Sequence, residues 1–494
     1  MTAADTPLSL SRFGTRARRH SDFAAATVIR ALQGRAAVYN NIGDNERAIA
    51  DLARARFLSR ACGERKLHAD SMLKLSEVHL SLSRYQEALS CARESLAEYR
   101  EIGDRPGQAG SLNNIGLVYD GLGDYPGAIR HFTESLAIHR ETGNQLGQAM
   151  SLNNLGAIAY RLGNYREAIG RFQASVALYT EIGDRYGLGM SINNMASLHQ
   201  VLGDRQAALE CYQRSQDIFR AIGDRQGQGM SLSNIGSLLL TMGDYGRAAE
   251  CFTASLEIRQ KVGDVFGQAT SHYNIGTLEL IRGRFDAALE SFVRSLALCE
   301  SIGDRYALAG SLIGIGRVHL NQGRWQQASE HLSRGEQVAK GINYRDAARK
   351  ALLGLAEAAL GAGDPATAEA KLGEAATLAE VIGSKVGGAE CDLMRGKLLA
   401  SRAASLRQGE QPGEWSKLLG DAAASFESAL RVYEDLGQRL SVADTCEAYA
   451  SMLEGIPGDL AAGLGLTGTA RSWQEKAEAL FRDLGLVYRV RGAG

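Results

Sequence analysis

Few features of this chain match those of secreted, membrane-spanning or strongly charged proteins. Its 494 residues include only six prolines and seven cysteines, and the cysteines form no C-x-x-C pair. There is also no N-x-Ser/Thr sequon, so the sequence argues against a disulfide framework and favours a reducing, cytoplasmic compartment. No apolar run approaches the ~20 residues that cross a bilayer. The 55 basic and 56 acidic residues give a formal net charge of −1, which does not support general binding to nucleic acid or to an anionic membrane.

Glycine is abundant instead, and part of it recurs at a fixed interval. A glycine followed by Asp or Asn occurs every 40 residues, at Gly103-Asp104, Gly143-Asn144, Gly183-Asp184, Gly223-Asp224, Gly263-Asp264 and Gly303-Asp304. A second glycine lies 20 residues after each of these, at Gly123, Gly163, Gly203, Gly243, Gly283 and Gly323. A fixed period of this size indicates a repeat array, and each half-period has the length of one helix. We therefore predict an all-α solenoid of stacked helical hairpins.

Residues 103–142 illustrate how one hairpin is specified. Gly103 can adopt the left-handed conformation that ends a helix, and Asp104 can cap the start of the next one. Apolar residues follow one helical face in each half, with Leu112, Ile115 and Tyr119 in the first and Ala128, Phe132 and Leu136 in the second. Glycine is unfavourable inside a helix. Its recurrence therefore predicts that a neighbouring helix comes close at Gly116, Gly156, Gly236, Gly276 and Gly316.

This spacing of small and large residues resembles the tetratricopeptide repeat, whose signature is Leu-Gly-x-x-Tyr in the first helix and Ala-x-x-x-Phe in the second. Ile115-Gly116 with Tyr119, followed by Ala128 with Phe132, matches that signature. The 40-residue unit is similar to the longer repeats of Pins/LGN-type adaptors, kinesin light chains and many bacterial signalling proteins. The resemblance implies a right-handed superhelix whose first helices line a concave groove.

The phase of the repeat divides the chain into three regions. We expect a flexible N-terminus over residues 1–24 and a regular array of about nine to ten hairpins over 25–400. Beyond Leu398 the phase is lost, so we expect degenerate repeats over 401–494, with insertions at 401–420 and 455–468. Terminal repeats of a solenoid are atypical because they must cap the core with a polar face.

Residues that could carry catalysis are not grouped in a recognisable way. No Ser-His-Asp, Cys-His or H-E-x-x-H arrangement is readable. Residues 463–468 fit G-x-G-x-x-G, but no predicted strand precedes them and no βαβ unit surrounds them. His79, His199 and His319 occupy one register position in separate repeats, so we interpret them as packing residues. We expect a protein that is not an enzyme and that has no catalytic residue, metal site or cofactor.

A series of asparagines is the most informative polar feature. They recur in the predicted first helices, at Asn113, Asn114, Asn153, Asn154, Asn193, Asn194, Asn234 and Asn274. Asn is unfavourable inside a helix because its side chain competes for backbone hydrogen bonds, so its repetition calls for a partner. An amide offers a donor and an acceptor, as an extended peptide requires, and the resemblance implies that such asparagines bind the backbone of a peptide. The alternative is a ladder of asparagines between repeats, which is compatible with binding.

Three methionines recur just before these asparagines, at Met150, Met190 and Met230. They lie three or four residues ahead and therefore on the same helical face. Methionine adapts to varied apolar side chains, so the three residues could line the groove, or they could fill the core between helices. We expect no mid-helix Lys or Arg in the groove of the kind with which chaperone-binding tetratricopeptide domains clamp a terminal carboxylate.

The sequence thus predicts an adaptor or scaffold that binds a peptide or an extended segment of another protein in its concave groove. One alternative is a peptide-responsive regulatory sensor that controls an effector. Another is the recognition subunit of a separate enzyme. The identity of the partner and the oligomeric state do not follow from the sequence.

Overall fold

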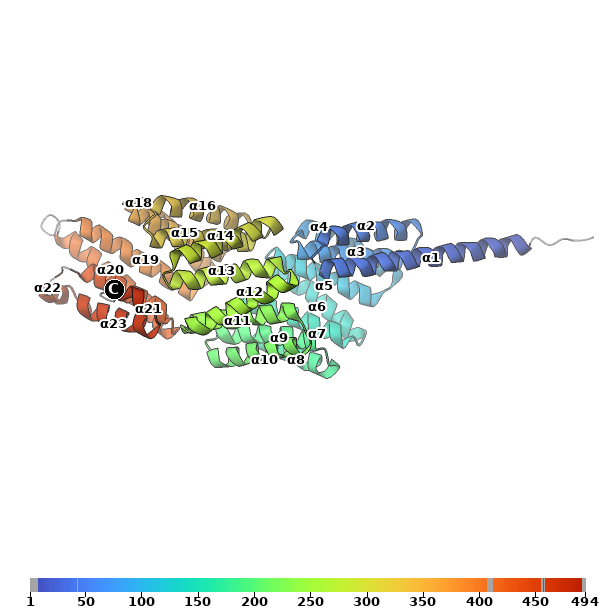
Figure 1. The fold of residues 1–494 in the computed structure, drawn as a ribbon, viewed down its shortest axis with the longest axis horizontal. Coiled ribbons are helices and arrows are strands. Elements are labelled where there is room, and N and C mark those ends of the chain that lie inside the picture. The colour runs from blue at the N-terminus through green and yellow to red at the C-terminus, as the bar shows by residue number, and fades with distance from the viewer. Residues whose placement is uncertain (1–7, 42, 407–411, 455, 457, 491–494) are drawn as a thin grey trace, which may run out of the picture. The chain divides into compact units, whose positions relative to one another are not determined.

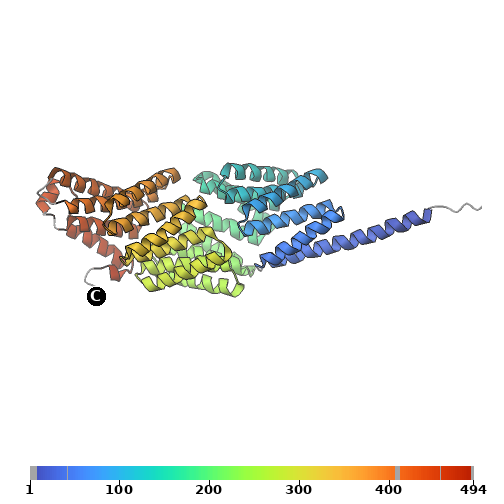
Figure 2. The same ribbon diagram turned by 90° about the horizontal axis from the view of Figure 1, so that it is seen from above.

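The computed structural model describes residues 8–41, 43–406, 412–454, 456 and 458–490, and these form an all-α protein (Figures 1 and 2). No strand occurs in these ranges. The chain divides into two compact units, Met1–Gly227 and Gln228–Gly494, which we describe separately. The predicted fold class, a solenoid of helical hairpins, is confirmed.

The first unit contains ten complete helices joined by short turns. They are α1 (Leu8–Asn41), α2 (Asn45–Ala61), α3 (Arg65–Ser81), α4 (Tyr85–Ile102), α5 (Arg105–Gly121), α6 (Tyr125–Glu141), α7 (Gln145–Arg161), α8 (Tyr165–Ile182), α9 (Arg185–Val201) and α10 (Arg205–Ala221). Helix α11 (Arg225–Met242) begins at the end of this unit and lies mostly in the second.

The second unit continues the same pattern and ends less regularly. Its helices are α12 (Tyr245–Val262), α13 (Val265–Ile281), α14 (Phe285–Ile302), α15 (Arg305–Asn321), α16 (Trp325–Gly341), α17 (Arg345–Gly361), α18 (Pro365–Ile382), α19 (Lys385–Ser405), α20 (Pro412–Asp435), α21 (Arg439–Leu453), α22 (Gly458–Gly463), α23 (Ala470–Asp483) and the 3-10 helix η1 (Val487–Arg489).

The turns between helices form as the glycine pattern predicts. Gly103 has a φ of 71° and closes α4, and the Asp104 side chain accepts a hydrogen bond of 2.9 Å from the Gly107 N–H at the start of α5. The register continues where glycine is replaced, because Ser83 and Asn343 adopt the same left-handed conformation at φ values of 55° and 56°. The backbone therefore adopts the left-handed conformation at the end of a helix whether the residue there is glycine, Ser83 or Asn343.

The mid-helix glycines allow close packing inside each hairpin, as predicted. A Cβ added at Gly116 would lie 2.6 Å from the Phe132 ring, and one added at Gly276 would lie 2.9 Å from the Phe292 ring. Both rings are almost fully buried. The second helix can therefore approach the first only because these positions have no side chain.

A buried serine in each regular second helix reinforces this approach. Its hydroxyl donates to a backbone carbonyl in the first helix of the same hairpin, at 2.7 to 2.9 Å, in the pairs Ser95–Ala69, Ser135–Ala109, Ser175–Ala149, Ser215–Gly189, Ser255–Gly229 and Ser295–Ala269. The same hydroxyl can also reach the next hairpin, because Ser95 Oγ lies 3.0 Å from Ser111 Oγ. The serines are fully buried, so each hydroxyl has its partner inside the protein.

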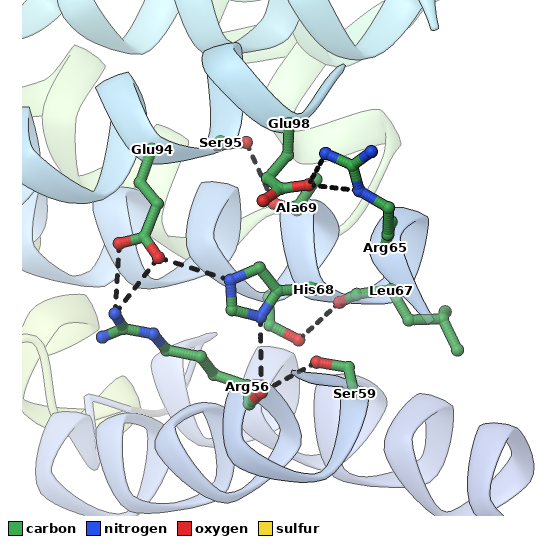
Figure 3. A network of polar contacts seen from close by, with 10 residues as sticks. Arg56, Ser59, Arg65, Leu67, His68, Ala69, Glu94, Ser95 and Glu98 are labelled. Atoms are coloured by element: carbon green, nitrogen blue, oxygen red, sulfur yellow. Dashed lines mark hydrogen bonds and ion pairs between the residues drawn. The ribbon is translucent and has the colours of Figure 1, made fainter. Parts of the chain in front are cut away.

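Charged residues join neighbouring hairpins at the surface of this core (Figure 3). The Glu94 carboxylate of α4 receives both a bond from Arg56 of α2, at 3.1 Å, and a contact with Nε2 of His68 in α3, at 3.3 Å. His68 also contacts the Arg56 carbonyl through Nδ1. One carboxylate thereby links three consecutive helices.

The helices form two layers within each unit. Successive odd-numbered helices contact one another, as α3 does α5 and as α13, α15, α17, α19 and α21 do in series. The even-numbered helices pack mainly on the odd-numbered helices beside them. Because the first helices of successive hairpins are the more closely spaced layer, they form the inner, concave side of each unit.

The regions expected to be irregular are largely helical where they are described. Helix α19 continues to Ser405 and α20 starts at Pro412, so these two helices take in most of 401–420, while 407–411 lie outside the described residues. The segment 455–468 holds α22 and a turn in which Gly465 and Gly468 have φ values of 71°. Helix α1 starts at Leu8, and the flexibility of residues 1–24 remains a prediction.

Two alanine substitutions separate the role of backbone conformation from that of space. Gly203 has a φ of 83° at the end of α9, whereas Gly170 lies inside α8, and a Cβ at either position would have no heavy atom within 4 Å. Gly203→Ala should lower the free energy of unfolding by ~1 kcal/mol, because the left-handed conformation strains a residue with a Cβ. Gly170→Ala should raise it by up to ~1 kcal/mol. Urea unfolding of both variants checks this, and a shift of the same sign in both would contradict the assigned turn.

Candidate functional site

The predicted asparagines of the first unit bond to one another along the concave layer. Asn154 Nδ2 donates to Asn113 Oδ1 at 2.9 Å, and Asn194 Nδ2 donates to Asn153 Oδ1 at 3.0 Å. Each bond joins consecutive first helices across 41 residues of sequence. The first asparagine of one repeat is therefore the acceptor for the second asparagine of the next repeat, and the inter-repeat ladder exists.

The ladder leaves one polar group on each of Asn153 and Asn154 available. Asn153 Oδ1 accepts two bonds, from Asn194 and from the Ser191 hydroxyl at 3.1 Å. Its Nδ2 group and the Oδ1 atom of Asn154 bond no described residue, and both side chains are half-buried at the concave surface. One donor and one acceptor on adjacent residues are the groups that an extended backbone needs.

The remaining predicted positions surround this ladder. Asn114 donates to the Leu73 carbonyl at 3.4 Å and also bonds Glu77. Burial raises the pKa of Glu77. The charge of Lys74 and the hydrogen bond from Asn114 oppose this shift. Asn193 is buried, whereas Asn234 and Asn274 are half-buried. Their positions on α9, α11 and α13 continue the register of the series.

The three predicted methionines differ in exposure. Met150 on α7 is 44% exposed, whereas Met190 on α9 and Met230 on α11 are half-buried. Met150 therefore offers an apolar surface to solvent, and the other two contribute part of their surface to packing.

The second unit contains a cavity that the sequence did not predict. It measures about 890 Å³ and opens along the concave layer of α13, α15, α17, α19 and α21. Lining residues from these first helices include Tyr273, Thr277, Ile313, Arg317, Leu353, Glu357, Leu393, Lys397, Asp444 and Ala448. Aromatic and aliphatic groups thus alternate with charged ones along the groove.

Charges in the middle of this groove are paired, whereas one on α15, toward its α13 end, has no partner among the described residues. Lys397 Nζ lies 3.1 Å from Glu357 Oε1. The charge of Lys397 lowers the pKa of Glu357, and that of Glu357 raises the pKa of Lys397, so both groups are held in their charged forms. The exposed Arg317 side chain forms no hydrogen bond or ion pair with any residue that the structure describes, and its charge acts on Glu357 from a distance.

Two carboxylates share one cation at the α21 end of the groove. Arg489 bonds Asp444 at 3.0 Å and also pairs with Glu447, so one cation faces two carboxylates. Burial raises the pKa of Asp444, and Arg489 and Lys397 oppose this. Burial would lower the pKa of Arg489, but the charges of Asp444 and Glu447 outweigh it and raise the value. The groove therefore has a cation without a described partner on α15 and two carboxylates that share one cation at α21.

Residues that could support catalysis are not assembled. No cluster of three or more His, Cys, Asp or Glu side chains within the described ranges could hold a metal ion. All seven cysteines are free, and His79, His199 and His319 lie on separate helices, α3, α9 and α15. The G-x-G-x-x-G segment runs from the end of α22 into the turn before α23. None of the described helices combines the length and apolarity required to span a membrane.

Sequence models of the tetratricopeptide repeat match most of the regular array. The matches cover residues 68–102, 107–181, 188–261, 267–341 and 313–382, which is more than half of the chain. The chain belongs to the tetratricopeptide repeat family. A comparison with curated protein sequences gives no match. The narrower resemblance to Pins/LGN-type adaptors remains a prediction.

Solved structures share the fold of this tetratricopeptide repeat protein. One is a Rap protein complexed with Competence and Sporulation Factor, with 13% identity and a TM-score of 0.50, covering 78% of this chain and 98% of that chain. Another is the Rap conjugation gene regulator of the plasmid pLS20 in complex with the Phr* peptide, with 12% identity and a TM-score of 0.50, covering 76% and 98%. At these identities the likeness establishes the fold alone.

The groove of the second unit corrects one expectation about the repeats. Arg317 and Lys397 are mid-helix cations that line it, so the prediction that the groove has no mid-helix Lys or Arg is wrong for this unit. The signal was present, because Arg317, Glu357 and Lys397 follow one another at 40-residue intervals in the register of Leu117. Likewise Tyr273, Ile313, Leu353 and Leu393 occupy the register of Asn113. The asparagine series ends where this second pattern begins.

Proposed function

We propose that this tetratricopeptide repeat protein is an adaptor that holds an extended segment of a partner protein against its first helices. The groove of the second unit carries the proposal. Its 890 Å³ lie at the upper end of the range for ligand pockets and extend across five helices. Aromatic and aliphatic side chains such as Tyr273 and Leu353 offer apolar contacts, and charged side chains between them supply direction.

The charges of the groove favour one orientation of the bound segment. Arg317, toward the α13 end, has no partner among the described residues, and an anionic group of the ligand would supply one. Asp444 and Glu447 share a single cation, Arg489, at the α21 end, so a cationic group of the ligand is favoured there. Complementary charges at two ends of a groove fix direction and register.

The asparagines of the first unit extend the proposal to a second surface. We place a bound backbone against Asn153 and Asn154. The ladder does not use Nδ2 of Asn153 or Oδ1 of Asn154. The related positions are Asn113, Asn114, Asn193, Asn194, Asn234 and Asn274, with Met150, Met190 and Met230 beside them as apolar contacts. In this proposal the ladder holds the amides in place, and Nδ2 of Asn153 and Oδ1 of Asn154 bind the ligand backbone.

A peptide-responsive sensor is the second candidate. It is favoured by the two fold-similar Rap structures, since one is a complex with Competence and Sporulation Factor and the other a complex with the Phr* peptide. In that case the ligand would be a free short peptide, and its binding would control an effector. Either function is non-enzymatic, and the seven free cysteines support a reducing, cytoplasmic compartment for both.

Charge reversal at the free cation tests the groove. Peptides are first selected from a random dodecapeptide library on the wild-type chain, and their Kd values are then measured by fluorescence anisotropy. Arg317→Glu should weaken the selected peptides at least ~10-fold, because a bond to a charged group contributes ~1.5–3 kcal/mol. Arg431→Glu is the matched control, since Arg431 is also an exposed, unpaired arginine of the second unit but lies on α20 outside the groove. Equal weakening by both variants, or no selected peptide, would contradict the proposal.

The asparagine surface is tested by replacing Asn114, Asn154 and Asn194 together with Ala. Each loses a hydrogen bond worth ~0.5–1.5 kcal/mol, and the higher helix propensity of Ala offsets part of this, so the chain should remain folded. The binding free energy of peptides on this surface should weaken by ~1–3 kcal/mol for each ligand group that loses its hydrogen-bond partner. Circular dichroism reports folding and anisotropy reports binding. A variant that unfolds, or that binds at wild-type affinity, would show that the asparagines serve only the ladder.

A further inference from the structure

The end of the described chain contacts the beginning of the second unit. The Tyr488 hydroxyl donates to the Ile281 carbonyl at 2.7 Å, across 207 residues of sequence. A Cβ added at Gly283, in the turn after α13, would lie 2.5 Å from the Tyr488 ring. In a solenoid each repeat contacts only its neighbours, so a contact of this range is an additional connection.

A second contact lies one repeat, or 40 residues, earlier. A Cβ added at Gly243, in the turn after α11, would lie 2.4 Å from Leu484. The two turns are themselves joined, because Arg282 donates to the Tyr245 carbonyl at 2.7 Å. Residues 484–490 therefore rest on the turns after α11 and α13, which are equivalent turns of two successive repeats and in which glycine leaves the space free of side chains.

The same segment is anchored to the last hairpin through Arg489. Its guanidinium bonds Asp444 and Glu447 of α21 and lies 4.5 Å from the centroid of the Phe481 ring. Arg489, Asp444 and Glu447 belong to the α21 end of the groove already described, and Asp444 and Glu447 line it. The segment thus joins the groove to the turns after α11 and α13.

We infer that residues Leu484–Val490 form a releasable clasp that closes the second unit on itself and thereby sets the width of its groove. Leu484 and Leu486 are buried, whereas Val487 and Tyr488 are 52% and 49% exposed, so the contact with the turn after α13 lies at the surface. When the clasp is closed, Arg489 neutralises part of the negative charge of the groove. When it is released, Asp444 and Glu447 face the groove without their partner and the turns at Gly243 and Gly283 are uncovered.

Hydrogen exchange of the ligand-free, full-length chain tests the clasp independently of any partner. The amides of Gly243, Asp244, Gly283 and Arg284 donate to carbonyls at the ends of α11 and α13, so their exchange reports on the protection of the two turns. Tyr488→Ala should raise exchange in peptides covering these turns on the order of 10-fold, while α17 stays unchanged. Val487→Ala is the matched control, since it removes a neighbouring exposed side chain and should leave both turns protected.

A purely local capping role gives a different pattern. In that case Tyr488→Ala would raise exchange in α23 and leave the turns after α11 and α13 unchanged, which would overturn the inference. Equal changes in both variants would also overturn it. If Tyr488→Ala does not fold, Tyr488→Phe keeps the ring and removes only the bond to Ile281, and should raise exchange at Gly283 and Arg284 by about two- to tenfold. Unchanged exchange at these amides would count against the clasp.

Discussion

The buried hydrogen bond from a serine of each regular second helix to a backbone carbonyl of the first is the contact on which the stack depends. Such a bond forms only when two helix backbones come close, and this requires small residues at the contact. Ser95 meets Ala69, and Ser215 meets Gly189. The close approach inside each hairpin brings successive first helices together as an inner layer. That layer, with its 40-residue register, determines which side chains reach the concave surface.

One backbone register supports two different surfaces. In the first unit the position of Asn113 is repeated by Asn153 and Asn193, and the concave face carries a ladder of amides. In the second unit the same position holds apolar residues such as Leu353, and the position four residues later holds charges such as Lys397. The fold therefore fixes where a ligand can lie, and the residues at a few register positions decide its chemistry.

The sequence predicted the helices far better than the site. Glycine at positive φ and aspartate at the next position are local signals, so the boundary at Gly103 follows from a few residues. The asparagine partners also follow from the register, although the choice between ladder and ligand does not. The cavity depends on how five hairpins curve together, and the contact of Tyr488 with Ile281 joins residues 207 apart. This contact occurs once in the chain and not in every repeat, so the periodic pattern of the sequence does not predict it.

The central claim is that a partner lies against the first helices of this protein, and photo-crosslinking tests it most directly. A benzophenone amino acid is placed at Tyr273 or Leu353 in the groove, and in separate variants at Val293 or Thr377, which lie exposed on the second helices α14 and α18. Each variant is irradiated with a peptide selected on the wild-type chain. If a partner binds the first helices, crosslinked product should form at Tyr273 and Leu353, and little should form at the other two positions. Crosslinking mainly at Val293 and Thr377 would contradict it.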